Sequence, residues 1–338
     1  MTALQSAIVA LLDEGSIEPN VAAAALEAIM QGEATEAQMG AFLAGMRTHG
    51  ETPEILAACW GVMERHAEPI AVGEVVDLCG TGGDRADTFN VSTAAAFVVA
   101  GAGGRVAKHG NRAASSKCGS ADLLEALGAN IDLGGEDVSR VIEGCGFGFL
   151  FAQRFHPAMR FLGGPRRELG TRTIFNVLGP ISNPAQPRAQ LTGVSTEKQG
   201  LLIAEAFRIR GLERAMVVHA KDGLDEISPA TPTHAWILDN GQLREEELTP
   251  DMFGVEGCSL EEVAGGAAEE NAETLRNTLS GQGGAVLDFV TLNAAAGCWV
   301  AGLADSFTEG AAQARESIAS GTAKTVAESY VRLTQEIS

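Results

Sequence analysis

The sequence lacks the features of several common protein classes. Its six cysteines are scattered along 338 residues, and no two of them form a Cys-x-x-Cys pair. This spacing favours neither a zinc site nor a disulfide framework, and it predicts reduced thiols. No uncharged apolar run reaches the roughly 20 residues that a membrane-spanning helix needs, and the first eight residues contain no basic side chain. We therefore expect a cytoplasmic protein that does not associate with a membrane.

Positive charge is also scarce, because 24 Lys and Arg stand against 44 Asp and Glu, a formal net charge of −20. A chain this acidic repels nucleic acid unless its basic residues gather on one face. Ten of them do gather between positions 105 and 172, against seven acidic residues. This window has no regular basic stripe, and its aromatic residues stand in apolar surroundings. It therefore suits a small polyanion better than a nucleic acid.

Two common phosphate-binding motifs are missing. No Gly-x-x-x-x-Gly-Lys-Ser/Thr sequence occurs, and Gly80-x-Gly82 is followed by Arg85 where a dinucleotide fingerprint requires glycine or alanine. The sequence thus indicates neither an ordinary NTPase nor a Rossmann-type enzyme.

The remaining composition, 45% hydrophobic and 20% charged residues, is typical of a globular protein, and the length favours two domains. Capping signals at Thr35 and at Thr52-Pro53 predict helices, so we expect residues 1–68 to form a small helical bundle. From Glu74 onward, short β-rich runs alternate with alanine-rich helical runs, which predicts an α/β layer with a mainly parallel sheet. The expected strands lie at 75–78, 105–107, 147–152, 189–194 and 215–219, with a hairpin turn at 239–241 and helices after about residue 265.

Three segments have the composition of anion-binding loops. Gly80–Asp84 follows an apolar run, and glycines let the backbone N–H groups approach a phosphate. Asn90–Thr93 supplies capping residues where a buried helix should begin. Lys108–Lys117 combines fixed charge, hydroxyls and an amide. Taken singly, the glycines fit a tight turn equally well, and Lys108 fits a solvated surface charge.

The order and spacing of these segments resemble those of the anthranilate phosphoribosyltransferases. The resemblance rests on Gly80–Asp84, Lys108–Ser116 and Asp222–Glu226, and it continues through Arg166–Asn176 and Gly179–Pro184 to a helical carboxyl terminus. It covers nearly the whole chain, although Cys118 stands where a serine is often seen.

This resemblance implies an α/β fold in which a small helical domain is joined to a larger α/β domain across a cleft that contains the active site. Residues 1–70, joined in space by about 154–186, would form the small domain. Residues 71–153 and 187–338 would form the domain that binds phosphoribosyl pyrophosphate. Apolar helix faces suggest a homodimer through the helical domain, at Ala23, Leu26, Ile29 and Met30.

The resemblance also implies a reaction, the Mg²⁺-dependent transfer of the phosphoribosyl group of phosphoribosyl pyrophosphate to the amino group of anthranilate in tryptophan biosynthesis. An aromatic amine has a free lone pair and needs no strong general base, so catalysis should consist of positioning and charge neutralisation. Lys108, Asn111 and Arg166 would be the positioning residues. The residues implied for phosphoribosyl pyrophosphate are Gly80, Gly83, Asp84, Thr88, Asn90, Val91, Ser92, Thr93, Lys108, His109, Gly110, Asn111, Arg112, Ala113, Ala114, Ser115, Ser116 and Ser120.

For the second substrate, a bidentate guanidinium suits the anthranilate carboxylate, and Arg166 is the matching residue. Gly80, Asn111, His109 and Pro180 would line the ring and the amine, although a lone histidine fits a structural hydrogen bond equally well. Mg²⁺ would be held by Ser92, Asp225 and Glu226. By themselves, the two acids also fit an ordinary acidic turn.

Two other functions stay open on sequence alone. Pyrimidine nucleoside phosphorylases share this architecture, but the base-recognition residues that they need are not found here. A non-catalytic, nucleic-acid-binding paralogue should have a basic surface and a degraded acidic pair, whereas this chain keeps Asp225-Glu226 and a net charge of −20.

Overall fold

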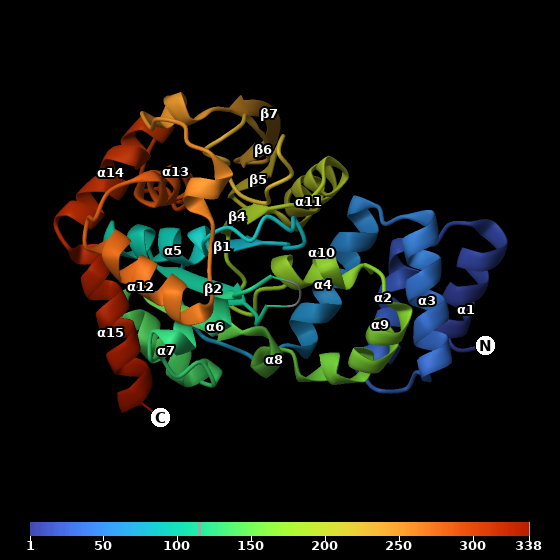
Figure 1. The fold of residues 1–338 in the computed structure, drawn as a ribbon. Helices are drawn as coiled ribbons and strands as arrows, with labels where there is room; N and C mark the ends of the chain where they lie inside the picture. The colour runs from blue at the N-terminus through green and yellow to red at the C-terminus, as the bar shows by residue number, and fades with distance from the viewer. Residues whose placement is uncertain (114–115, 338) are drawn as a thin grey trace.

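The computed structural model describes residues 1–113 and 116–337 of the chain. Its amino-terminal part is a bundle of helices, as the sequence predicts (Figure 1). The Thr35 and Thr52 side chains each accept a backbone N–H from the helix that follows, so both predicted helix starts are confirmed. The bundle consists of α1 (Ala3–Val9), a π-helical turn η1 (Ala10–Glu14), α2 (Pro19–Met30), α3 (Glu36–His49) and α4 (Pro53–His66).

A seven-stranded sheet of order β3-β2-β1-β4-β5-β6-β7 forms the centre of the larger part. The pairs from β3 to β5 are parallel, whereas β6 and β7 add antiparallel pairs at one edge, which confirms the predicted fold class. Asn240 and Gly241 have positive φ angles of 48° and 80°, as a tight hairpin turn requires. The strands are β1 (Val76–Gly80), β2 (Val106–Gly110), β3 (Phe147–Phe151), β4 (Ala189–Gly193), β5 (Arg214–Ala220), β6 (Thr233–Asp239) and β7 (Gln242–Leu248).

Two hydrophobic cores lie on opposite faces of this sheet. Side chains alternate along a strand, and in β5 Met216 and Val218 belong to one core while Ala215 and Val217 belong to the other. The first core is covered by α5 (Val91–Gly101) and α13 (Ala285–Val300), in which most side chains are buried. The second core is continuous with the interior of the helical bundle, because α11 (Glu197–Arg210) packs between the sheet and α4.

The remaining helices complete the layer around the first core. Those after residue 265 confirm the helical carboxyl-terminal part that the sequence predicts. The full set of remaining helices and turns is α6 (Ser120–Ala126), α7 (Gly135–Cys145), the 3₁₀ turns η3 (Pro250–Phe253) and η4 (Leu260–Val263), α12 (Ala268–Leu279), α14 (Phe307–Ala319) and α15 (Thr322–Glu336).

Between β3 and β4 the chain returns to the helical bundle, and we call residues 152–188 the returning segment. It contains α8 (Ala152–Phe155), the 3₁₀ turn η2 (Pro157–Leu162), α9 (Gly163–Leu169) and α10 (Phe175–Ile181). In Figure 1 the green α9 and α10 lie beside the blue helices of the bundle, and α9 contacts α3 while α10 contacts α4. Their apolar side chains share the core of the bundle.

One expectation about the bundle surface is wrong. Leu26, Ile29 and Met30 are buried and Ala23 is half-buried, so these side chains fill the interior of the bundle and offer no face to a second copy. All six cysteines are free thiols. No helix in the described part of the chain is long and apolar enough to cross a bilayer.

Candidate active site

The centre of the sheet contains a topological switch point. From β1 the chain proceeds through β2 to β3 on one side, and it later enters β4 and β5 on the other. The loops that leave the carboxyl ends of β1 and β4 therefore diverge, which opens the crevice where α/β proteins bind ligands. The last residues of the two strands, Gly80 and Gly193, are register partners. The predicted glycine loop thus lies at the switch point.

The Asp222–Glu226 turn lies across the ends of these two strands. A Cβ atom on Gly193 would be 1.5 Å from the Asp225 carbonyl oxygen, and one on Gly80 would be 2.6 Å from the Asp225 carboxylate. Both positions therefore require glycine because the acidic turn passes so close. The Gly82 N–H donates to Asp225 Oδ2 at 2.6 Å, which ties the glycine loop to the acidic turn.

The charges of Asp84, Asp225 and Glu226 act on one another at this point. Burial raises the pKa of Asp225, and the nearby charge of Asp84 raises it further. Burial and the charge of Asp225 likewise raise the pKa of Glu226, while the charge of Lys108 and a hydrogen bond to Ser92 oppose the rise. Mutual repulsion of this kind marks a place where a cation would be favourable.

Lys108 is the only lysine or arginine that is buried in the described part of the chain, with 2% of its surface exposed. It extends from β2, and its ammonium group donates to the Leu78 carbonyl of β1 and, at 3.3 Å, to the Ser92 hydroxyl of α5. Its hydrogen-bond partners are neutral oxygens, so its charge is left to act on Glu226 and on whatever binds beside it.

The start of α5 differs from the sequence expectation in one respect. Asn90 occupies the capping position, but its side chain forms no capping hydrogen bond. Its amide instead donates to the Cys118 carbonyl at 2.9 Å and accepts from Asn271 at 2.9 Å. No capping side chain therefore covers the beginning of α5. Of the other predicted residues here, Val91 and Thr93 are buried, and Thr88 forms a β-bridge with Ala264.

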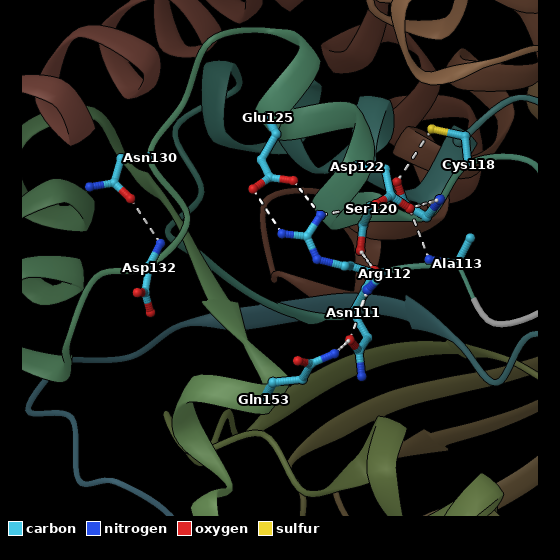
Figure 2. Close-up of polar contacts among 11 residues, drawn as sticks. Asn111, Arg112, Ala113, Cys118, Ser120, Asp122, Glu125, Asn130, Asp132 and Gln153 are labelled. Carbon is cyan, nitrogen blue, oxygen red and sulfur yellow. Dashed lines mark hydrogen bonds and ion pairs between the residues drawn. The ribbon is translucent and has the colours of Figure 1, made fainter. Parts of the chain in front are cut away.

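The loop after β2 is braced against α6 (Figure 2). Asp122 accepts the backbone N–H groups of Ala113 and Gly119, each at 2.9 Å, and fixes the course of the loop. Arg112 forms a two-pronged ion pair with Glu125, so its guanidinium is engaged by protein carboxylates. The loop is therefore better able to bind an anion through its backbone N–H groups than through the charge of this arginine.

Other predicted residues of this loop are placed less centrally. The Ser120 hydroxyl donates to the Asn111 carbonyl at 3.3 Å, and Gly110 is required because a Cβ atom would lie 2.4 Å from Ser120 Oγ. Ser116 is exposed. Ala114 and Ser115, which were also predicted to bind phosphate, lie outside the described residues.

The residues predicted to face anthranilate have few polar partners. Arg166 on α9 is half-buried, and burial lowers its pKa. Its guanidinium lies 5.5 Å from the ring centre of Phe175 and has no carboxylate partner among the residues that the structure describes. Pro180 interrupts α10, and its carbonyl accepts from Gln190 at 3.0 Å. The amide oxygen of Asn111 accepts from Gln153 at 3.4 Å (Figure 2).

His109 is paired with a histidine that the sequence did not reveal. Its ring lies edge-on to that of His156, with the centroids 5.1 Å apart. His156 Nε2 donates to the Ser182 carbonyl at 3.0 Å, which leaves Nδ1 as a bare acceptor. His109 Nε2 and His156 Nδ1 are both buried without a hydrogen-bond partner. Burial lowers the pKa of both rings, to about 4 for His156.

Sequence reasoning also missed the buried residues that hold these groups in place. Asp77, fully buried in β1, accepts the His109 N–H at 3.2 Å and the Asn183 amide at 2.8 Å. Asn183 also donates to the Ala107 carbonyl, so the returning segment is pinned to two central strands. Burial raises the pKa of Asp77 to about 6. A charged residue inside the apolar run 75–79 was the one signal available.

Two surface hollows lie away from these residues. One of about 400 Å³ is found between the amino ends of β1, β4 and β5 and the end of α13. The other, of about 390 Å³, is lined by prolines of the loops near residues 229–232 and 249–257. Neither contains the glycine loop or the acidic turn. The convergence of loops and charges at the switch point therefore marks the candidate active site, and the size of a hollow does not.

The chain is similar to known proteins along nearly its whole length. The family described as "Glycosyl transferase family, helical bundle domain" matches residues 5–67, and "Glycosyl transferase family, a/b domain" matches residues 72–324. Anthranilate phosphoribosyltransferase of Desulfatibacillum aliphaticivorans is 48% identical over 313 residues, which are 92% of this chain and 93% of the relative.

Solved structures agree with this similarity. Anthranilate phosphoribosyltransferase from Thermus thermophilus superposes with a TM-score of 0.93 at 41% identity and covers 99% of this chain and 100% of its own. The enzyme from Saccharomyces cerevisiae in complex with phosphoribosyl pyrophosphate and Mg has a TM-score of 0.90 at 29% identity, with 98% of each chain covered. The same yeast enzyme has also been solved in complex with 4-fluoroanthranilate.

Proposed function

The chain belongs to the anthranilate phosphoribosyltransferases of the glycosyl transferase family, and from this premise we propose which of its residues carry out each part of the reaction. The activity is the transfer of the 5-phosphoribosyl group from phosphoribosyl pyrophosphate to the amino group of anthranilate, a step of tryptophan biosynthesis. The amine lone pair attacks C1′ of the ribose, pyrophosphate leaves with the bonding electrons, and the amine loses a proton. The barrier lies mainly in the departure of pyrophosphate, so charge stabilisation matters more than a strong base.

The glycine loop and the start of α5 form the wall for phosphoribosyl pyrophosphate. This assignment is supported by the switch-point position of Gly80 and by the absence of a capping side chain at α5. Lys108 adds a buried positive charge between β1 and α5. The backbone of the loop after β2, held by Asp122, closes this wall on the other side.

The residues at the acidic turn fit a magnesium ion. Asp225, Glu226 and the Ser92 hydroxyl are hard oxygen donors, and burial and the neighbouring carboxylates raise the pKa values of the two acids. No group of three or more His, Cys, Asp or Glu side chains in the described residues is arranged to hold a metal alone. This suits Mg²⁺, which commonly combines one or two carboxylates with phosphate oxygens. When bound, it supplies positive charge that stabilises the leaving pyrophosphate.

The wall for anthranilate is formed by α9 and α10 of the returning segment and by the end of β2. The observation that carries this assignment is the Arg166 guanidinium, which is half-buried beside Phe175 and has no carboxylate of its own among the described residues. A substrate carboxylate would complete it with two hydrogen bonds. His109 and Pro180 line the ring, and Asn111 lies between the two walls.

Contacts between helices support the domain division that the resemblance implies. Because α9 contacts α3 and α10 contacts α4, we include residues 154–186 with residues 1–70 in the small domain, and we assign 71–153 and 187–338 to the large one. We further propose a cytoplasmic homodimer. Val9 and Leu12 are exposed apolar side chains of the bundle, 41% and 67% accessible, and are candidates for its interface.

A fluorescence assay tests this function. Purified protein is mixed with anthranilate and phosphoribosyl pyrophosphate, with and without Mg²⁺, and the loss of anthranilate fluorescence is followed. We expect rapid loss that requires both the donor and Mg²⁺, and stoichiometric release of pyrophosphate. A folded protein that leaves the fluorescence unchanged would refute the function, and phosphorolysis of pyrimidine nucleosides would be the next assay.

A further inference from the structure

Arg172 joins the two loops that diverge at the switch point. It belongs to the returning segment, six residues after Arg166. Its Nη1 atom donates to the Ser195 hydroxyl at 2.9 Å, and both Nη atoms lie 3.4 Å from the Gly82 carbonyl oxygen. Gly82 follows β1 and Ser195 follows β4. One guanidinium therefore spans the crevice from a third segment of the chain.

The contact with the glycine loop is close. Gly83 has a φ angle of 86°, and a Cβ atom there would lie 2.5 Å from Arg172 Nη1. Gly82, with φ of 65°, is held on both sides, because its N–H donates to Asp225 and its carbonyl accepts from Arg172. Two successive glycines can adopt many backbone conformations in a free chain. These contacts select one orientation of their N–H groups.

The charge of Arg172 is not used in a direct ion pair. Its partners in the described residues are a carbonyl and a hydroxyl, and no carboxylate oxygen lies within 4.0 Å of its guanidinium. Its Nε is buried without a partner. If its only role were to brace a loop, such a guanidinium would lower the stability of the folded protein more than an exposed one. An anion that binds beside it offsets this loss of stability.

We propose that Arg172 is a positioning residue for phosphoribosyl pyrophosphate, which rests on the function proposed above. It fixes the glycine loop in the shape that receives the anion and adds positive charge behind that loop. Since Arg166 belongs to the same segment, the segment that presents the carboxylate-binding arginine also shapes the loop for the other substrate. One segment thereby supplies an arginine for each substrate: Arg166 binds anthranilate, and Arg172 positions the loop for phosphoribosyl pyrophosphate.

The test compares Michaelis constants in the full-length enzyme. Arg172→Gln should raise the KM for phosphoribosyl pyrophosphate about tenfold, which corresponds to about 1.4 kcal/mol. The KM for anthranilate should change less than about twofold, because the Arg166 side of the site is untouched. Arg172→Lys should recover part of the loss, since an ammonium group keeps the charge but cannot reach both loops. Arg188→Gln, at the opposite end of β4, is the matched control and should leave both constants unchanged.

Ser195→Ala covers the case in which the Arg172 variants fail to fold. It removes the 2.9 Å acceptor and leaves the guanidinium, so the KM for phosphoribosyl pyrophosphate should rise about two- to threefold. Two results would overturn the proposal: a loss of thermal stability with both KM values unchanged, or a rise confined to anthranilate. Both differ from failure of the proposed function, in which the wild-type protein itself would not consume anthranilate.

Discussion

The wall that we assign to phosphoribosyl pyrophosphate and the wall that we assign to anthranilate differ in which of their polar groups are already paired. The first wall leaves the buried Thr81 and Thr93 hydroxyls without a partner, but its backbone groups are held. On the first wall, Gly82 is held by Asp225 and Arg172, and Asp122 holds two backbone N–H groups of the neighbouring loop. On the second wall, the Arg166 guanidinium and one nitrogen each of His109 and His156 have no hydrogen-bond partner among the described residues.

This difference follows from the two ligands. A pyrophosphate group accepts hydrogen bonds from many directions, so a loop of preformed backbone donors can bind it, and the loop itself must be kept in shape. Anthranilate offers one planar carboxylate and one ring, and a few side chains aimed at it are sufficient. A buried ring nitrogen without a hydrogen-bond partner lowers the stability of the free protein, and the second wall carries this cost at its two histidines.

The acidic turn of the first wall should give the largest effect. Asp225→Asn keeps the acceptor for the Gly82 N–H but removes a charge, so we expect kcat/KM in Mg²⁺ to fall at least about 100-fold, or about 2.7 kcal/mol. The metal-free variant should melt at a higher temperature than the wild type, because a buried repulsion is gone. Asp222→Asn in the same turn is the control. An unaltered Mg²⁺ titration of Asp225→Asn would place the metal elsewhere.

Removal of the unpaired guanidinium on the second wall should have the next largest effect. Arg166→Ala should raise the KM for anthranilate about 30-fold and change the KM for phosphoribosyl pyrophosphate less than about twofold, since a charged hydrogen bond to a carboxylate contributes about 1.5–3 kcal/mol. Arg160→Ala is the matched control, because Arg160, like Arg166, lies over a phenylalanine ring of the returning segment but is exposed. Equal effects of both variants on anthranilate would remove Arg166 from the pocket.

Sequence reasoning predicted the bundle, the five parallel strands and the hairpin because their signals are local: capping residues, alternating runs and turn residues. It also selected Gly80, Lys108 and Asp225, which the structure brings together at the switch point. It missed Asp77 and His156, and it considered Arg172 as a structural ion-pair partner, whereas Arg172 contacts a carbonyl and a hydroxyl. The roles of all three depend on contacts with distant parts of the chain. The Asn90 cap was expected from local preference, but tertiary contacts with Cys118 and Asn271 replaced it.

The two buried histidines of the second wall predict a pH effect of intermediate size. The pKa of His156 is about 4 in the folded protein and about 6.5 in an unfolded chain. The unfolded state therefore binds a proton first, so stability is complete above pH 6.5 and is lost as the pH falls toward 4. Near pH 5 the loss should be about 2 kcal/mol.

Chemical denaturation between pH 4.5 and 7.5 measures this loss. His156→Gln keeps a donor for the Ser182 carbonyl but does not titrate, so its stability should fall less steeply in acid than that of the wild type. His234→Gln, on β6 and away from the second wall, serves as the control. Identical slopes for His156→Gln and the wild type would show that the second wall does not carry this cost.

The smallest effect should come from the exposed brace on the first wall. The Arg112 and Glu125 side chains are 44% and 40% exposed, and exposed ion pairs contribute less than about 1 kcal/mol. Glu125→Gln should thus lower the free energy of unfolding by no more than that amount and change the KM for phosphoribosyl pyrophosphate less than about threefold. Asp122→Ala, which releases two backbone N–H groups, should do clearly more to both. If Glu125→Gln were the more damaging variant, the wall would depend on the charge of Arg112 and not on a backbone that Asp122 holds in place.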